Sequence, residues 1–335
     1  MEHRSRISAR SAQNNIKMQL KALVERIDLD GRRATGVTWS DPPGRHSARA
    51  RREVILCGGS FNSPQLLQLS SIGPASLLRS NGVSPQHDLP GVGENLQDHF
   101  CVGAEYRSTV KSTVNDLYNN KLKGGQLLLY LLFRTGPFAD NVNYSNTFIK
   151  SGPDIDRPDM MVTFMAWCTD EHLKPLPFSG FTILAEHMRP NSRGHVRLTG
   201  PKPCDAPEIQ FNFLADEVDQ RAAIAGLRFG RRIAATDPMA RCVGTELTPG
   251  EDLQSDQELL EYCRGSGLSL LHPVGSCKMG AGPDAVVDPR LRVRGIDGLR
   301  VVDASIMPRI VTGNTNAATI MIGEKAAAMI NEDAR

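Results

Sequence analysis

The run Val54-Ile55-Leu56-Cys57-Gly58-Gly59-Ser60 passes from an apolar segment without alternation into a pair of glycines. An unbroken apolar run of this kind is typical of a strand buried on both faces, as in a parallel sheet. Residues 62–69 follow, with Ser63 at a capping position and Pro64 at the first position of a predicted helix. The order strand, glycine turn, helix predicts a βα unit whose free N–H groups point above the strand end. The glycine pair alone is also compatible with a βα unit that binds no ligand.

The residues before this unit alternate between polar and apolar side chains over short runs. Asp30-Gly31 and a Pro-Gly loop separate the runs, which predicts a β-meander. Further on, short strands mix with helices, and the apolar spacing predicts helices over 217–236 and 256–264. We therefore expect an α/β (α+β) chain in which a mostly antiparallel sheet with helices interrupts a parallel-sheet domain. The domain changes are expected near residues 100 and 270.

The composition excludes several classes of protein. The net charge is only +2 and aromatic residues make up 5% of the chain, so nucleic acid is not an expected partner. The seven cysteines are scattered and never spaced as C-x-x-C, which argues against disulfides or a zinc site and favours a reducing compartment, the cytoplasm. The longest apolar run, 127–133, is far shorter than the roughly 20 residues that span a bilayer. We expect a buried helix there, no transmembrane segment, and at most a peripheral association with membranes.

A second informative stretch, residues 271–330, places a histidine, aspartates and asparagines among glycines and prolines between apolar runs. Loops between a strand and a helix often carry functional side chains in this way. The composition of the stretch leaves another interpretation open, in which two polar turns flank a strand. Cys277 could be a nucleophile, although a buried structural thiol is the simpler interpretation.

Five short segments are more informative as an ordered set than any one of them alone. They are 59–74 (GSFNSPQLLQLSSIGP), 88–99 (DLPGVGENLQDH), 272–280 (HPVGSCKMG), 303–308 (DASIMP) and 313–316 (GNTN). The set resembles the glucose–methanol–choline (GMC) family of flavin oxidoreductases, and within it the choline-dehydrogenase-like alcohol dehydrogenases. The resemblance extends over about residues 17–332, and Ser71, where the family usually has glycine, is one departure from it.

The resemblance implies a partial Rossmann-like FAD/NAD(P)-binding domain made of residues 17–99 and 269–332, with residues 100–268 as the substrate-binding domain. It implies FAD as the cofactor and no metal site. Thr315 and Asn316 would open a helix whose N-terminus faces the flavin, where negative charge develops on reduction. The full set of cofactor-binding residues that the resemblance implies is Val24, Gly58, Asn95, Asp303, Ala304, Thr315 and Asn316.

The resemblance also implies oxidation of the CH–OH group of a small alcohol, either choline-like or aliphatic and primary. His272 would take the hydroxyl proton while a hydride passes to flavin N5, and imidazole suits this task because its reference pKa lies near neutrality. Asn314 would orient the alcohol oxygen, since an amide forms hydrogen bonds but cannot take the proton. The implied partners are the alcohol and an electron acceptor, either a quinone or oxygen.

One family feature does not occur in the sequence. The strand, G-x-G-x-x-G turn and helix that bind the ADP half of FAD have no counterpart, because the only early glycines are Gly31, Gly36 and Gly44. Residues 1–16 are polar and without periodicity. We therefore expect the chain to begin well inside a usual family sequence, with the missing N-terminal half either lost or carried by another chain. Two alternatives follow: a truncated, non-catalytic remnant that does not retain FAD, and an enzyme that resembles hydroxynitrile lyases on the same fold.

Overall fold

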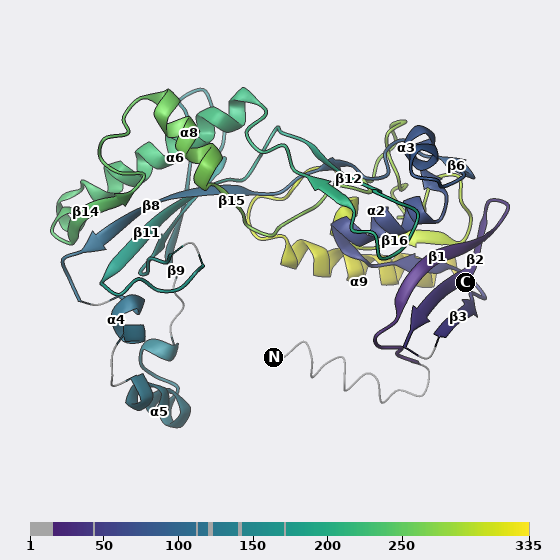
Figure 1. The fold of residues 1–335 in the computed structure, drawn as a ribbon, viewed down its shortest axis with the longest axis horizontal. Coiled ribbons are helices and arrows are strands. Elements are labelled where there is room, and N and C mark those ends of the chain that lie inside the picture. Colours follow the sequence, from purple (N-terminus) through teal and green to yellow (C-terminus); the bar gives the residue numbers. More distant parts are fainter. Residues whose placement is uncertain are drawn as a thin grey trace.

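The computed structural model describes residues 16–334 with the exception of 43, 112, 120–122, 140–142 and 171. Figure 1 shows two bodies that lie side by side and are joined by extended segments. One body is built on a large antiparallel sheet, and the other contains a parallel strand pair with its helix. This mixture confirms the predicted α/β (α+β) class.

An antiparallel meander of three strands lies at the edge of the second body. Its strands are β1 (Leu23–Asp30), β2 (Arg33–Asp41) and β3 (Gly44–Arg49). Gly31 has a φ of 55° in the turn between β1 and β2, a conformation that glycine adopts without steric cost. The predicted meander is therefore confirmed, with its first turn at the expected position.

The parallel pair brings together two segments that are far apart in the sequence. Strand β4 (Val54–Leu56) pairs in parallel with β16 (Leu299–Val301). Val54 and Leu56 are buried, whereas Ile55 is 42% exposed. The expectation that this strand is buried on both faces is therefore wrong for Ile55, because its side chain lines a cavity.

Helix α2 (Gly59–Leu69) follows β4 and begins before the position that the capping signals predict. Pro64 lies inside the helix instead of at its first position, and Ser63 is the residue before it and not the cap. A proline lacks the N–H that would bond to the carbonyl four residues earlier, here that of Ser60. The buried hydroxyl of Ser276 donates to this carbonyl at 2.6 Å. A distant segment thus replaces the missing helical bond, which is why the helix can extend across the proline.

The large sheet has six strands, and all of its pairs are antiparallel, as predicted. Its order is β14-β8-β11-β10-β9, with β15 paired to β8. The strands are β8 (Phe100–Ser108), β9 (Asn143–Ile149), β10 (Met160–Met165), β11 (Gly180–His187), β14 (Val243–Thr248) and β15 (Leu268–Ser269).

Two helices cover one face of this sheet. Helix α6 (Glu217–Ala234) packs across β8, β10 and β11, and helix α8 (Asp256–Ser266) packs on α6. The Asp216 side chain caps α6 by accepting a hydrogen bond from a backbone N–H at 2.8 Å. Ser255 and Glu258 form a capping box at the start of α8. Both predicted helices are confirmed to within two residues at their ends.

A small three-stranded sheet packs against helix α2. It contains β7 (Glu94–Leu96), β12 (Gly194–Arg197) and β13 (Glu208–Gln210), in the order β13-β12-β7. The fully buried Gln68 side chain of α2 donates to the carbonyl of Val196 at 3.0 Å. Part of the range predicted as substrate-binding domain therefore packs on the helix of the parallel pair.

The remaining elements are α3 (Ala75–Ser80), α4 (Val114–Asn119), α5 (Lys123–Phe133), α7 (Asp237–Ala240), α9 (Asn316–Asp333), β5 (Ile72–Gly73), β6 (His87–Asp88), η1 (Pro137–Ala139) and η2 (Ala304–Ile306). Strands β5 and β6 form a parallel pair of their own. Helix α9 lies at the end of the described chain, and it begins at Asn316, the last residue of the segment 313–316.

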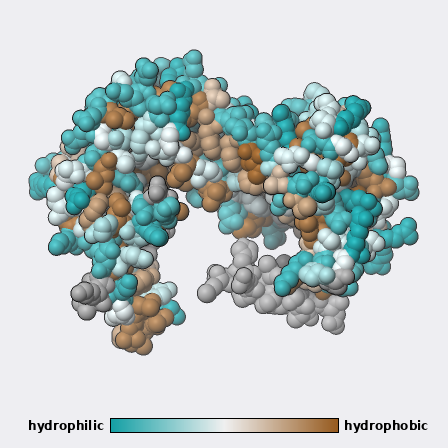
Figure 2. All heavy atoms as spheres, viewed as in Figure 1, coloured by the Kyte–Doolittle hydropathy of each residue, from teal (hydrophilic) through white to brown (hydrophobic). Residues whose placement is uncertain are grey.

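Helix α5 protrudes from the antiparallel body. Leu128, Leu131, Leu132 and Phe133 are each more than half exposed, and Figure 2 shows apolar surface at this end of the molecule. The expectation of a buried helix is wrong here, because no element in the described part of the chain covers this face. None of the helices among the described residues has the length and apolar composition needed to cross a membrane.

The buried side chains form separate cores. One core contains residues from 27–92 together with residues from 274–326, which are brought together around β4 and β16. The two others contain only residues from 100–263. On this basis we propose the same division that the sequence suggests: 17–99 with 269–332 in one domain and 100–268 in another.

The bond between Ser276 and Ser60 yields a test of how α2 tolerates its proline. Ser276→Ala should lower the free energy of unfolding by about 1–3 kcal/mol, because it leaves a buried carbonyl without a donor. In a Pro64→Ala background residue 64 regains its N–H, so the same substitution should cost less. Urea denaturation of the four proteins measures the difference, and equal costs in both backgrounds would contradict this account of the helix.

Candidate active site

His272 is held by its backbone next to the start of β8. Its N–H donates to Oδ1 of Asp98 at 2.8 Å, and the N–H of His99 donates to the same oxygen at 2.8 Å. The second oxygen of Asp98 accepts from the hydroxyl of Ser269. One buried carboxylate therefore fixes the main chain of both histidines and of the turn that leads from β15 to His272.

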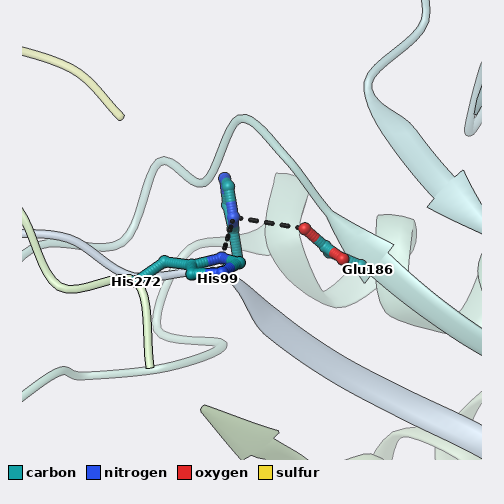
Figure 3. A group of neighbouring side chains, drawn as sticks. All are labelled: His99, Glu186 and His272. Carbon is teal, nitrogen blue, oxygen red and sulfur yellow. Dashed lines mark hydrogen bonds and ion pairs between the residues drawn. The ribbon is translucent and has the colours of Figure 1, made fainter. Parts of the chain in front are cut away.

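The side chains of His272 and His99 meet through their Nδ1 atoms, which are 3.0 Å apart. Their rings are nearly perpendicular, at 89°. Oε1 of Glu186, near the end of β11, lies 3.2 Å from the same Nδ1 of His99. Figure 3 shows His99 between the other two side chains, which come from separate elements. His99 is fully buried and Glu186 is 2% exposed, so only His272 reaches the open side of this group.

Burial determines the protonation of the groups around His272. Burial raises the pKa of Asp98, against the lowering effect of its hydrogen bonds to Ser269, His272 and His99. Burial also lowers the pKa of His272, and a positive charge on His99 would lower it further, while Glu186 and Asp98 act in the opposite direction. A lowered pKa keeps His272 neutral near pH 7, which is the state that can accept a proton.

Asn314 lies on the open side of His272. Its Nδ2 is 3.2 Å from Nε2 of His272, so the structure brings together the two residues that the sequence predicts to be catalytic. Asn314 comes directly before Thr315, the N-cap of α9, and Asn316, the first residue of that helix. A helix N-terminus carries a partial positive charge, so this end of α9 is suited to a group that gains negative charge.

His99, Glu186 and His272 are close enough to be compared with a metal site, because one potential ligand atom from each lies within 4.8 Å of the others. The nitrogen–nitrogen distance of 3.0 Å is that of a hydrogen bond. Two ligands of a tetrahedral zinc ion with bonds of about 2.0–2.1 Å would lie about 3.3 Å apart. We therefore interpret the three side chains as a hydrogen-bonded group and not as metal ligands.

Two of the predicted cofactor-binding residues, Val24 and Gly58, line one cavity of about 760 Å³. The cavity lies where β4 ends and α2 begins, and Ile55 and Cys57 also line it. Its volume is in the range of ligand pockets, and the carboxyl ends of parallel strands are where dinucleotides bind in folds of this kind. The residues present therefore fit a part of FAD at this end, and α9 offers a second helix N-terminus beside His272.

Asp303 and Ala304 follow β16 and begin η2. The buried carboxylate of Asp303 accepts hydrogen bonds from Gly59 N at 3.0 Å, Ser63 Oγ at 2.6 Å, Ser305 N at 2.8 Å and Ser305 Oγ at 2.5 Å. These bonds occupy both carboxylate oxygens. A contact between Asp303 and a cofactor would therefore involve its main chain, and the same side chain already joins α2 to η2.

Asn95 also has its side chain engaged by the protein. Its Nδ2 donates to the carbonyl of Gly275 at 3.1 Å, and its Oδ1 accepts from Nε of Arg193 at 3.1 Å. Asn95 does not line the cavity that contains Val24 and Gly58. Its observed contacts tie β7 to the segment after His272, and its role toward a cofactor stays a prediction.

Three residues of the site were not predicted from the sequence: Asp98, His99 and Glu186. Asp98 and His99 end a recognisable segment, and adjacent acidic and imidazole side chains at the end of a glycine-rich loop are a usable signal. Glu186 is an acidic residue in the mostly apolar and buried strand β11, and a buried charge in such a strand usually has a partner. Only the pairing of β11 with β8 places it next to His99.

Comparison with known proteins agrees with this arrangement. Two family models described as GMC oxidoreductase match the chain, an N-terminal one over residues 2–101 and a C-terminal one over residues 190–323. Together they match more than half of the chain, which belongs to the GMC oxidoreductase family.

The relatives that resemble the chain include two bacterial enzymes named oxygen-dependent choline dehydrogenase. That of Chromohalobacter salexigens is 40% identical over 94% of this chain and 56% of its own length. That of Staphylococcus aureus strain MSSA476 is 38% identical, with the same coverage of both chains. The chain thus spans little more than half the length of these relatives.

Solved structures with the same fold include two oxidases. Pyridoxine 4-oxidase from Mesorbium loti is 29% identical, with a TM-score of 0.84 over 97% of this chain and 60% of that one. An Aspergillus oryzae RIB40 formate oxidase variant is 26% identical, with a TM-score of 0.89 over 96% of this chain and 62% of that one. These likenesses confirm the fold class.

The four bonds to Asp303 lead to a prediction about stability. Asp303→Asn should lower the free energy of unfolding by about 2 kcal/mol or more, since an amide NH₂ would then face donors in the interior. The exposed pair of Asp284 with Lys278 provides a matched control, in which Asp284→Asn should change stability by less than about 1 kcal/mol. Urea denaturation measures both, and equal effects would contradict the structural role of Asp303.

Proposed function

We propose that the chain forms the catalytic part of an FAD-dependent oxidoreductase that oxidises the CH–OH group of a small alcohol. The observation that carries this proposal is the contact of Asn314 with Nε2 of His272, on the side of the imidazole that faces away from the interior. FAD, when bound, supplies the acceptor for the hydride that leaves the alcohol carbon. The cofactor would be held by Val24 and Gly58 at the cavity, by the main chain at Asp303 and Ala304, by the N-terminus of α9 at Thr315 and Asn316, and by Asn95.

His272 removes the hydroxyl proton of the alcohol at Nε2. Its lowered pKa keeps this nitrogen available near neutral pH, and the backbone bond to Asp98 fixes the position of the residue. Asn314 donates a hydrogen bond from Nδ2 to the alcohol oxygen and so orients the hydroxyl toward His272. Because an amide cannot take the proton, His272 is the base and Asn314 the orienting residue.

The substrate that we propose is a choline-like or an aliphatic primary alcohol. Two observations support this substrate. The relatives are named choline dehydrogenase, and their sequences are 40% and 38% identical to this chain over 94% of its length. We propose oxygen as the electron acceptor, following the words "oxygen-dependent" in those names, with a quinone as the alternative. All seven cysteines lie among the described residues and are unpaired, which supports a cytoplasmic location.

The purified chain should take up FAD and show flavin absorbance, and choline added without oxygen should bleach it. His272→Ala should slow this reduction by about 10²–10⁴-fold, the usual effect of losing a general base. His46→Ala, in the exposed strand β3, is a matched control that should leave the rate unchanged. Aliphatic alcohols, pyridoxine and aryl alcohols are compared in the same assay to identify the substrate class.

Three outcomes would contradict the proposal. A chain that stays colourless after incubation with FAD would favour the remnant that does not retain the cofactor. Bound flavin that no alcohol reduces, together with release of an aldehyde from a hydroxynitrile, would favour the lyase. Equal reduction rates of wild type and His272→Ala would remove His272 from the role of base.

The direction of the His272 pKa shift predicts the pH dependence. Activity requires the neutral imidazole, so kcat/KM should fall as the pH drops through the pKa of His272. Burial holds this pKa below its ordinary value of 6.5, and the nearby His99 lowers it further. At pH 6.5 kcat/KM should therefore exceed half of its plateau, and a half-maximal point above pH 6.5 would contradict the assignment.

A further inference from the structure

The contact between the two histidines requires that one Nδ1 donates and the other accepts, since they are 3.0 Å apart. For His272 to act as a base at Nε2, its single proton must sit on Nδ1. That proton then points at Nδ1 of His99, which accepts it. The base-competent form of His272 thus fixes the tautomer of His99, whose own proton must sit on Nε2.

His99 is unusual in having a second polar neighbour at the nitrogen that already contacts His272. Oε1 of Glu186 lies 3.2 Å from Nδ1 of His99, and this oxygen has no hydrogen bond from the described residues. Nε2 of His99 is likewise buried without a partner in the described chain. The resting arrangement of the described residues therefore places a carboxylate oxygen without a hydrogen bond beside the nitrogen of His99 that accepts from His272.

The situation changes when His272 gains a proton at Nε2. The ring then carries two protons, and the one on Nδ1 lies within hydrogen-bond distance of Nδ1 of His99. Its transfer would leave His272 neutral and give His99 both of its protons. His99 would then carry a positive charge, with its Nδ1 3.2 Å from Oε1 of Glu186, and attraction between opposite charges is strong in a buried site.

We propose that His99 and Glu186 form a buried proton relay behind His272, which receives the proton that His272 takes from the alcohol; this rests on the proposed function. The alcohol O–H bond breaks as an N–H bond forms at Nε2 of His272. The Nδ1–H bond of His272 breaks as an N–H bond forms at Nδ1 of His99. The relay moves protons only, and no electrons are exchanged among these residues. Glu186 is a positioning residue, because it acts through His99.

The other ionisable groups near the relay do not compete for the proton. Asp98 accepts from two backbone N–H groups and from Ser269, so both of its oxygens are occupied. Burial and the charge of Glu186 raise the pKa of the Cys101 thiol to about 12, so it stays neutral. Among the described residues, Glu186 is therefore the carboxylate that has an oxygen without a hydrogen bond close to the ring of His99.

The test uses the wild-type chain with ¹⁵N-labelled histidine, without flavin or substrate. Variants His99→Gln and His272→Gln assign the ring signals. As the pH is lowered, the ¹⁵N shifts should show both nitrogens of His99 protonated while His272 keeps a single proton. Observation of the added proton on His272, with His99 keeping one proton throughout, would overturn the relay.

Glu186→Gln provides the second measurement, since it removes the charge and keeps the shape. The pH at which the two histidines together gain the added proton should move lower, because the charge of Glu186 favours a positive charge on this pair, as it does on His272 itself. Asp159→Asn is the matched control: this buried carboxylate bonds to Ser151 and should leave the titration midpoint of the two histidines unchanged. An unchanged midpoint in Glu186→Gln would also overturn the relay.

Glu186→Asp keeps the charge at a greater distance, and its midpoint should lie between those of wild type and Glu186→Gln. Thermal denaturation confirms that each variant is folded, and the wild-type spectra decide the question if Glu186→Gln does not fold. Because the spectra need no flavin and no alcohol, their failure would overturn the relay alone. Failure of the flavin assay described above would overturn the proposed function instead.

Discussion

The arrangement of the site depends on the hydrogen bonds that the carboxylate of Asp303 accepts. Four hydrogen bonds to it join the N-terminal half of α2 to η2, two segments separated by more than two hundred residues. The same junction sets β4 beside β16, and the largest apolar core forms around that pair. A carboxylate in the interior is stable only when its lone pairs are satisfied, and here every donor comes from the chain itself. The fold therefore confines Asp303 to one geometry, and with it the loop that follows β16.

Asp98 has a comparable role on the other side of the site. Its carboxylate accepts hydrogen bonds from the backbone N–H groups of His99 and His272. These bonds hold two distant segments together, so that the two imidazoles meet at their Nδ1 atoms. The side chains behind His272 are buried, while the side toward Asn314 is open. In the mechanism that we propose, a proton enters at Nε2 of His272, and the groups that would accommodate it lie on the far side of the ring.

The sequence predicts the parts of this structure that depend on local pattern or on ordered motifs. The meander, α6 and α8 follow from turn residues, caps and helical spacing, and His272 and Asn314 follow from two motifs. The start of α2 could not be predicted, because local capping signals at Ser63 and Pro64 compete with two bonds that exist only in the folded chain. In these bonds Ser276 donates to the carbonyl of Ser60, and Asp303 accepts from the hydroxyl of Ser63. His99 and Glu186 were missed for the same reason, since strand register alone makes them neighbours.

The proline in α2 has a mechanical consequence for the protein. The carbonyl that Pro64 leaves free is bonded to Ser276, and the hydroxyl of Ser60 donates to the carbonyl of Pro273 at 2.6 Å. These two bonds fasten the first turn of α2 to the residues on either side of the turn after His272. Asn62 and Ser63 at the same end of α2 line the cavity together with Gly58. A displacement of α2 would therefore strain its bonds to the two residues that bracket the turn after His272.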